Sequence, residues 1–186
     1  YIDSQAEARR VFQDKLLGTL QVIAKDVKIQ LAFNAELVSK FRLIGYENRV
    51  LDHEDFRDDT KDAGELGSGH SVTALYELQL AEGVELAEAP GSIVDVSLRY
   101  KQPDADQSVE FTTSLLAADV GGTFEDASGE FRFAAAVAEY AEILRSSSFS
   151  EGADFASVLE IAQGTAGDKA DRAEFIELVT RASELW

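Results

Sequence analysis

Cysteine and methionine are absent from this sequence of 186 residues, and proline occurs only twice. Without cysteine there can be no disulfide bond, no thiolate metal site and no cysteine nucleophile, whereas the cellular compartment stays open. No run approaches about eighteen uninterrupted apolar residues, and no basic stretch leads into a short apolar one, so neither a membrane span nor a signal peptide is indicated. Because the chain starts at Tyr1, we expect it to be a piece of a longer protein.

Positive charge is also scarce, since 17 Lys and Arg stand against 35 Asp and Glu, for a net charge of −18. The imbalance lies after residue 50, where twenty-nine acidic residues face nine basic ones. Recognition of phosphates needs a basic patch, so we expect neither a nucleic-acid partner nor an anionic membrane partner. With 45% apolar residues the chain can nevertheless bury a core, and we predict that it folds.

Apolar periodicity indicates one helix followed by a set of strands. A capping box over 4–7 and an apolar stripe that ends at Ile23 predict the helix. Asn34 is predicted to cap a short helical turn over 35–40. About five strands are predicted from residues that alternate between apolar and polar: 27–33, 41–46, 72–80, 94–100 and 109–115. Strands that follow one another without helices favour an antiparallel sheet or sandwich.

After Gly121 and Gly122 the apolar period becomes helical again. Three stripes predict about three C-terminal helices, for which Ser128, Ser150 and Asp168 stand where N-caps are expected. The predicted fold class is therefore α+β: an antiparallel, β-sandwich-like sheet of about five strands, preceded by one helix and followed by about three helices.

Four stretches carry a resemblance to a known family. In chain order they read YIDSQAEARRVF, IAKDVKIQLAFNAELVSKFRLIGYENRVL, EDFRDDTKDAGELGSGHSVTALYE and LRYKQP. Together they resemble the region that follows the von Willebrand factor type A domain in bacterial surface or lipoprotein-type proteins, a family of unknown function. The motif residues that we single out are Arg42, Gly45, Tyr46, Arg49, Asp62, Gly64, Gly69 and His70.

The resemblance implies a domain organisation and a location. Residues 1–25 would be the last strand and helix of an upstream type A domain, or a linker from it; 26–120 would be the β-sandwich-like domain, and 121–186 a helical segment. The location would be extracytoplasmic, at the cell envelope. The metal-ion-dependent adhesion site of type A domains needs Asp-x-Ser-x-Ser, of which Asp3-Ser4 and Asp95-Val96-Ser97 are only fragments, so we assign no such metal to this chain.

The densest acidic stretch raises the question of a metal site. Calcium accepts about six to eight oxygen ligands from a flexible loop. The candidate ligands are Asp55, Asp58, Asp59, Asp62 and Glu65. Their spacing does not match the calcium loop in which alternating ligands precede a glycine and a late Glu. The preferred interpretation is a solvated connection whose acids pair with Arg42, Arg49 and Arg57.

The end of this stretch, GELGSGH at 64–70, is not a phosphate-binding loop, because no Lys-Ser or Lys-Thr follows and the next element is predicted to be a strand. Its glycines permit positive φ in a turn. A Ser/His/Asp relay through His70 and Ser71, or through His53 beside Asp55, is disfavoured, because adjacent residues of a strand point to opposite faces. We expect His70 to be buried and to have a structural role.

These observations predict no catalytic residue, no cofactor and no metal. We expect a non-catalytic accessory or scaffold region that supports protein–protein interaction at the bacterial cell envelope. Its expected partners are the upstream type A domain and an unidentified protein ligand; a homodimer of the fragment is also open, through an apolar patch that the longer protein would cover. The alternative is a calcium-binding or hydrolytic module that uses the acidic loop 52–70, for which Asp55, Asp59, Asp62 and His70 would have to converge.

Overall fold

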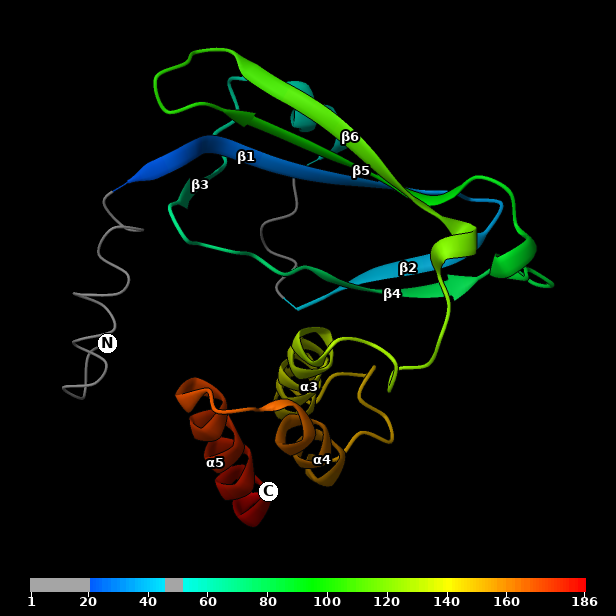
Figure 1. Ribbon diagram of the computed structural model, residues 1–186, viewed down its shortest axis with the longest axis vertical. Helices are drawn as coiled ribbons and strands as arrows, with labels where there is room; N and C mark the ends of the chain where they lie inside the picture. Colours follow the sequence, from blue (N-terminus) through cyan, green and yellow to red (C-terminus); the bar gives the residue numbers. More distant parts are fainter. Residues whose placement is uncertain (1–20, 46–51) are drawn as a thin grey trace. The chain divides into compact units, whose positions relative to one another are not determined.

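The computed structural model describes residues 21–45 and 52–186 (Figure 1). This part of the chain contains six strands followed by three α-helices, which makes the fold α+β. The chain divides into two compact units. The sheet unit comprises Tyr1–Lys40, Arg49–Val72 and Leu78–Val120, and the helical unit comprises Phe41–Asn48, Thr73–Glu77 and Gly121–Trp186.

A four-stranded antiparallel sheet forms the body of the sheet unit (Figure 1). Its strands, in spatial order, are β3 (Gly64–Gly67), β1 (Val22–Phe33), β5 (Ser92–Lys101) and β6 (Ser108–Leu116). The register of β1 against β5 shifts between Lys25 and Lys28, where Asp26 has a φ of +51°. Such a bulge bends a strand and increases its twist locally.

The register gives the sheet two chemically different faces. Ile29 of β1 lies opposite Leu98 of β5, which lies opposite Phe111 of β6. One residue away, Lys28 lies opposite Arg99, which lies opposite Glu110. Since side chains alternate between the faces of a sheet, one face is apolar and the other is charged and polar.

Part of the apolar face is covered within the sheet unit. A core cluster consists of Leu37, Val38, Ile93, Val94 and Ala117. Partly buried side chains of the short helix η4 (Leu86–Glu88) and of its neighbours pack against this cluster. Ile93 is only 2% exposed, and burying such a side chain stabilises a fold by about 1.5–3 kcal/mol.

A second, two-stranded sheet pairs β2 (Val38–Ile44) with β4 (Leu75–Leu80). Both strands pass from one compact unit into the other: Lys40 belongs to the sheet unit and Phe41 to the helical unit, while Glu77 belongs to the helical unit and Leu78 to the sheet unit. Each unit is therefore assembled from several separate segments of the sequence.

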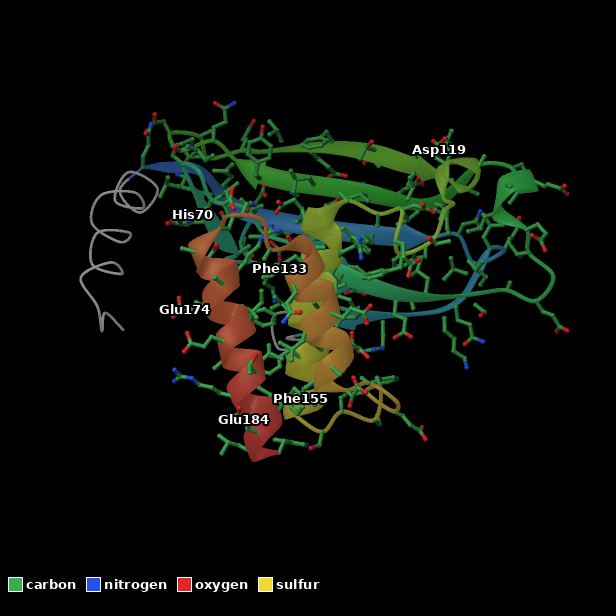
Figure 2. The ribbon with its side chains drawn as sticks, turned by 60° about the horizontal axis from the view of Figure 1, so that its bottom comes forward. His70, Asp119, Phe133, Phe155, Glu174 and Glu184 are labelled. Carbon is green, nitrogen blue, oxygen red and sulfur yellow. The ribbon has the colours of Figure 1, made fainter. Side chains whose placement is uncertain are left out.

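The helical unit contains α3 (Gly129–Leu144), α4 (Phe155–Thr165) and α5 (Ala170–Leu185). Aromatic rings contribute to the packing of these helices. The ring centroids of Tyr140 and Phe175 are 5.5 Å apart with the rings nearly perpendicular, and those of Phe133 and Phe175 are 5.4 Å apart in an edge-on arrangement. Figure 2 shows Phe133 on α3 and Phe155 at the start of α4. Among the described helices, none has the length and apolar character needed to cross a bilayer.

The helix caps were predicted with mixed success. Ser128 caps α3 as expected, because its hydroxyl accepts a hydrogen bond from the Phe131 amide at 3.2 Å. The cap expected at Ser150 is wrong, since Asp154 caps α4. The cap expected at Asp168 is also wrong, because Lys169 occupies the position before α5 and makes no side-chain cap.

The predicted sandwich-like sheet of about five strands is wrong. The described residues form six strands in two separate sheets, and β3 lies inside the stretch that was interpreted as a connection. Its four residues include two glycines, which leaves no alternation of apolar and polar residues to detect.

The predicted turn over 35–40 is shorter than expected, because β2 already begins at Val38.

The helix predicted before the sheet also needs correction. Within the described residues no helix precedes β1, and Ile23, the last residue of the predicted apolar stripe, belongs to that strand. The rest of the predicted helix, residues 4–20, lies outside the part of the chain that the structure describes. The predicted apolar stripe extended too far, because apolar residues three or four positions apart also occur by chance where an alternating strand begins.

Candidate functional site

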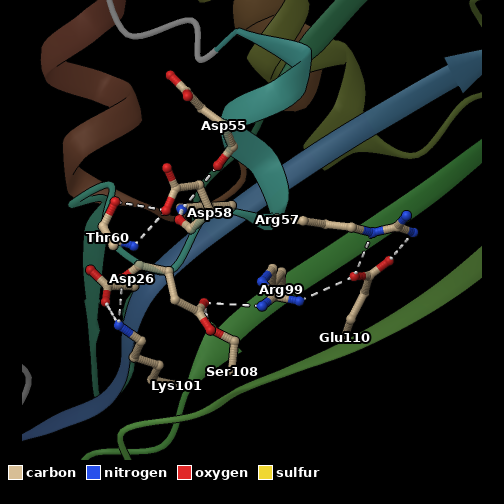
Figure 3. A network of polar contacts seen from close by, with 11 residues as sticks. Asp26, Asp55, Arg57, Asp58, Thr60, Arg99, Lys101, Ser108 and Glu110 are labelled. Atoms are coloured by element: carbon tan, nitrogen blue, oxygen red, sulfur yellow. Dashed lines mark hydrogen bonds and ion pairs between the residues drawn. The ribbon is translucent and has the colours of Figure 1, made fainter.

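The acidic stretch, residues 52–70, folds against β1, and Figure 3 labels Asp55, Arg57, Asp58 and Thr60 of this stretch. Its short helix η3 (His53–Arg57) carries Phe56, which is 4% exposed. The Nζ of Lys28 on β1, a residue only 3% exposed, donates hydrogen bonds to the main-chain oxygens of Asp55 at 3.2 Å and Asp58 at 2.5 Å. The ammonium thus gives a second, charged donor to two carbonyls that also accept the main-chain amides of Asp58 and Lys61.

Asp59 connects the same stretch to β5 and β6. Its Oδ1 accepts hydrogen bonds from the Ser108 hydroxyl at 2.5 Å and from Arg99 Nη2 at 3.0 Å; Figure 3 labels both of these partners. The Ser108 hydroxyl, followed by the Arg99 guanidinium, lowers the pKa of Asp59 below its usual value. The carboxylate is therefore committed to holding the stretch on the sheet.

Glu110 of β6 completes the network on the charged face. Its carboxylate accepts a hydrogen bond from Arg57 Nη2 at 2.9 Å and forms an ion pair with Arg99 Nη1 at 3.3 Å. Arg57, and then Arg99, lowers the pKa of Glu110. Because Arg99 reaches both Asp59 and Glu110, one guanidinium joins the acidic stretch to the outer strand.

The bulge residue Asp26 anchors the other end of the stretch. Its carboxylate lies 2.7 Å from Lys101 Nζ and accepts a hydrogen bond from the Ala63 amide at 3.3 Å. The hydrogen bond from Lys101 is the main cause that lowers the pKa of Asp26, against an opposing effect of burial. Hydrogen bonds and ion pairs with side chains of the sheet thus fasten the stretch at Asp59 and at Ala63.

The candidate calcium ligands do not form one site. Asp55 pairs with Lys61 at 3.2 Å, and Asp58 accepts hydrogen bonds from the amide and hydroxyl of Thr60. Asp62 and Glu65 are exposed. Over residues 21–45 and 52–186, no three or more acidic, histidine or cysteine side chains gather closely enough to hold a metal ion.

The glycine-rich end of the stretch is a strand and a turn. Gly64 opens β3, and Gly69 has a φ of +76°, the turn conformation that glycine permits. His70 is exposed, so the expectation that it is buried is wrong. Its amide donates to the main-chain oxygen of Gly67 at 3.1 Å, which makes it part of the turn.

A second polar cluster lies within the helical unit and contains Arg42. This guanidinium pairs with Glu77 at 2.5 Å, approaches Glu142 at 3.6 Å and stacks 4.0 Å above the Phe149 ring. Glu142 is 5% exposed and is also held by Arg145 at 2.6 Å. Burial opposes the charge of Glu142, but hydrogen bonds from Ser147 and Arg145 together leave its pKa lowered.

The remaining motif residues surround this cluster or fall outside the description. The Gly45 main-chain oxygen accepts a hydrogen bond from Arg145 at 3.3 Å, and Gly45 has a φ of +113°. Tyr46 and Arg49 lie outside the described residues. The predicted pairing of Arg42 and Arg57 with acids of the stretch is wrong, because Arg57 pairs with Glu110 and Arg42 with Glu77 and Glu142.

Lys28 and Phe56 were not among the residues predicted to matter. Lys28 occupies a polar position of an alternating strand, which normally faces water. Its burial depends on a segment almost thirty residues further along the chain. A usable signal was the single aromatic residue, Phe56, among the acids of 52–62, since a lone large apolar side chain in such a stretch indicates an anchor.

The helical unit also has a hollow of about 520 Å³. It is lined by Ile143, Ser146, Ser147, Ser148, Ser150, Glu151, Ala153 and Trp186. The Ser150 hydroxyl donates to the Ser147 main-chain oxygen at 2.8 Å, and the Ser147 hydroxyl accepts from the Phe149 amide at 3.2 Å. These two hydroxyls thus make hydrogen bonds within the turn after α3.

The most prominent surface of the sheet unit is the uncovered part of its apolar face. Four large apolar side chains of β1 and β6 stand out on it: Ile29 at 53% exposure, Val109 at 44%, Phe111 at 53% and Leu115 at 44%. The register places them with Leu98 and Tyr100 on one continuous face. We call this set of six residues the apolar row. Contiguous exposed apolar side chains of this kind mark interaction surfaces more often than isolated ones do.

Comparison with known proteins finds a family whose sequences match this chain. The sequence matches the family described as "Uncharacterized protein YfbK, C-terminal" over residues 18–185. The uncharacterized protein YfbK of Escherichia coli (strain K12) is 34% identical over 198 residues, which cover 98% of this chain and 34% of that protein. The chain thus spans about a third of the length of this curated relative. No solved structure matches.

Proposed function

This chain belongs to the family of YfbK C-terminal regions, and from that premise we propose that it is a non-catalytic accessory region that supports protein–protein interaction. The finer part of the proposal is that it serves a bacterial protein with a von Willebrand factor type A domain at the cell envelope. The observation that carries the proposal is the apolar row on the four-stranded sheet.

The contrast between the two faces of the sheet supports a docking role. The acidic stretch closes part of the charged face, where Lys28, Arg99 and Lys101 each have acidic or carbonyl partners. Within the described residues the apolar row has no comparable cover, and Ile29 and Phe111 leave about half of their surfaces in water. Burying apolar surface against a partner stabilises a complex by roughly 25 cal/mol per Å², before the losses of association are subtracted.

The chemistry of the carboxylates supports a structural role for the acidic stretch. A general acid or base must reach a substrate atom, whereas Asp26 is paired with Lys101, Asp59 with Ser108 and Arg99, and Glu110 with Arg57 and Arg99. Their pKa values are lowered, which is the effect of ion pairing and hydrogen bonding. Such carboxylates hold a surface in shape.

The test compares two double variants of the chain as bait in cross-linking and co-purification. Ile29→Ser with Phe111→Ser removes the apolar row, and Gln30→Ser with Thr112→Ser changes the opposite face by the same number of residues. We expect the first variant to lose the partners that the parent chain retains and the second to keep them, with circular dichroism unchanged in both. Equal recovery by both variants contradicts the proposal.

A further inference from the structure

We propose that β6 is a docking edge to which a partner protein adds an extended strand that alternates apolar and basic residues. The inference rests on the proposed function and specifies its binding mode and the chemistry of the partner. In strand addition, main-chain hydrogen bonds supply affinity and the alternating side chains supply specificity.

The position of β6 supplies the first argument. It ends the strand order β3-β1-β5-β6, and in the described chain it pairs only with β5 (Figure 1). Its nine residues keep a regular register from Val109 to Leu115. The outer side of such a strand presents a row of unpaired main-chain N–H and C=O groups.

The two edges of the sheet differ in their protection. The opposite edge, β3, has four residues, and its pairing with β1 is interrupted by two register shifts. Short or irregular edges resist the addition of a strand, as do edges that carry lysine or proline. β6 contains neither lysine nor proline, and its only charged residue, Glu110, is neutralised by Arg57 and Arg99.

The side chains of β6 define what would fit beside them. Val109, Phe111 and Leu115 lie on the apolar row and are each at least 44% exposed, whereas Thr112 and Ser114 lie on the opposite face. An incoming strand with an apolar residue at every second position would extend the apolar row by one strand. Cross-strand apolar pairs of this kind are the unit of stabilisation in a sheet.

The charge around β6 favours basic residues at the remaining positions of the partner strand. Residues 102–120, which contain β6 and its flanking turns, hold no Lys or Arg and, besides the paired Glu110, three acidic residues: Asp104, Asp106 and Asp119. Asp106 precedes the strand and Asp119 follows it, both exposed, and Figure 2 labels the side chain of Asp119. On the polar face, Asp95 beside the strand accepts from Ser114 at 2.7 Å and has no cationic partner in the described chain.

The same charge argues against a second copy of the chain as the occupant. Two chains that each carry a net charge of −18 repel one another, and two β6 strands would bring their acidic flanks together. A basic strand meets the acidic flanks with the opposite sign, which speeds encounter and fixes register.

The experiment uses the full chain, labelled with nitrogen-15, and a nine-residue peptide that alternates Lys and Val. Three control peptides change one property each: the same residues in block order, Glu in place of Lys, and methylated amide nitrogens along one edge of the alternating peptide. Binding is followed by fluorescence anisotropy, and the location by amide hydrogen exchange.

We expect the alternating peptide to slow exchange of β6 amides at least ~10-fold, and the methylated peptide to bind at least ~10-fold more weakly. Asp106→Asn with Asp119→Asn should weaken binding, whereas Asp62→Asn with Glu65→Gln near the other edge should not. Equal binding of the block and alternating peptides, protection away from β6, or no binding overturns the inference.

This outcome is separable from failure of the proposed function. If the Ile29 and Phe111 double variant loses partners while the methylated and unmethylated peptides bind alike, the apolar row binds proteins by its face and strand addition is wrong. If the double variant retains every partner, the proposed function fails whatever the peptides do.

Discussion

The ammonium of Lys28 lies 2.5 Å from the main-chain oxygen of Asp58, thirty residues further along the chain. This contact joins the longest strand of the sheet to the acidic stretch. A charge that is 3% exposed thereby has a partner, and the stretch gains a fixed position on the charged face.

Lys28→Met is expected to lower the free energy of unfolding by about 2–3 kcal/mol, because the main-chain oxygens of Asp55 and Asp58 lose a buried, charged hydrogen-bond donor. The measurement is urea unfolding at neutral pH. Lys40→Met is the matched control at an exposed position, and it should change stability by less than about 0.5 kcal/mol. Equal effects of the two substitutions would show that the contact does not hold the stretch.

Acid should release the stretch from the sheet. The pKa values of Asp26, Asp59 and Glu110 are lowered in the folded chain, so their contribution is complete above the usual carboxyl values near about 4. It is lost as pH falls through the lowered values. Amide exchange of residues 58–63 between pH 6 and pH 3 measures the loss. Asp59→Asn should flatten this pH dependence, and an unchanged profile would exclude the ion pairs as its source.

Glu139→Gln should stabilise the helical unit at neutral pH. Burial, with a smaller effect of Asp154, raises the pKa of Glu139, so stability falls as pH rises from the unfolded value to the raised folded one. The amide has no charge to bury. Above pH 6 the variant should therefore melt at a higher temperature than the parent chain, and near pH 3 the two melting temperatures should be equal. A rise of equal size at both pH values would point to packing instead.

Arg172→Met is expected to destabilise the helical unit by about 2–3 kcal/mol, since this 7%-exposed arginine binds the Thr165 main-chain oxygen at 2.6 Å, pairs with Glu130 and stacks on Phe133. Arg181→Met on the same helix removes only an exposed pair with Glu177, which is worth about 0.2–0.5 kcal/mol. Urea unfolding followed by the fluorescence of Trp186 compares them. Similar midpoints would refute the anchoring role of Arg172.

Calcium should leave the chain unchanged. The carboxylates of Asp55, Asp58 and Asp59 are divided among Lys61, Thr60, Arg99 and Ser108, so a metal would first have to displace these partners. Calorimetric titration to millimolar calcium should give no binding heat and no shift in the melting temperature. A saturable heat that Asp59→Asn abolishes would support the calcium alternative instead.

Local patterns predicted the parts of the fold that local interactions determine. The alternation of Leu98, Phe111 and their neighbours placed β5 and β6 within one or two residues of their observed bounds, because each apolar side chain faces the same side of the sheet. The cap at Ser128 was found for the same reason, since its partner is three residues away.

Contacts between distant segments were not predictable in this way. β3 is too short for periodicity, and it becomes a strand only because β1 lies beside it. Arg99 and Asp59 are forty residues apart, and nothing in either neighbourhood indicates that they meet. The acids therefore looked like a solvated connection, although the carboxylate of Asp59 holds the stretch on β5 and β6.

The interleaving of the two compact units has a consequence for any attempt to divide the protein. A polypeptide of residues 121–186 would retain all three helices but would lose Arg42 and Glu77, which belong to the same unit. Glu142 would keep Arg145 and lose its other cation, and Phe149 would lose the guanidinium stacked on it. Severing the chain at a single peptide bond thus leaves a charge in the helices that their own sequence only partly balances.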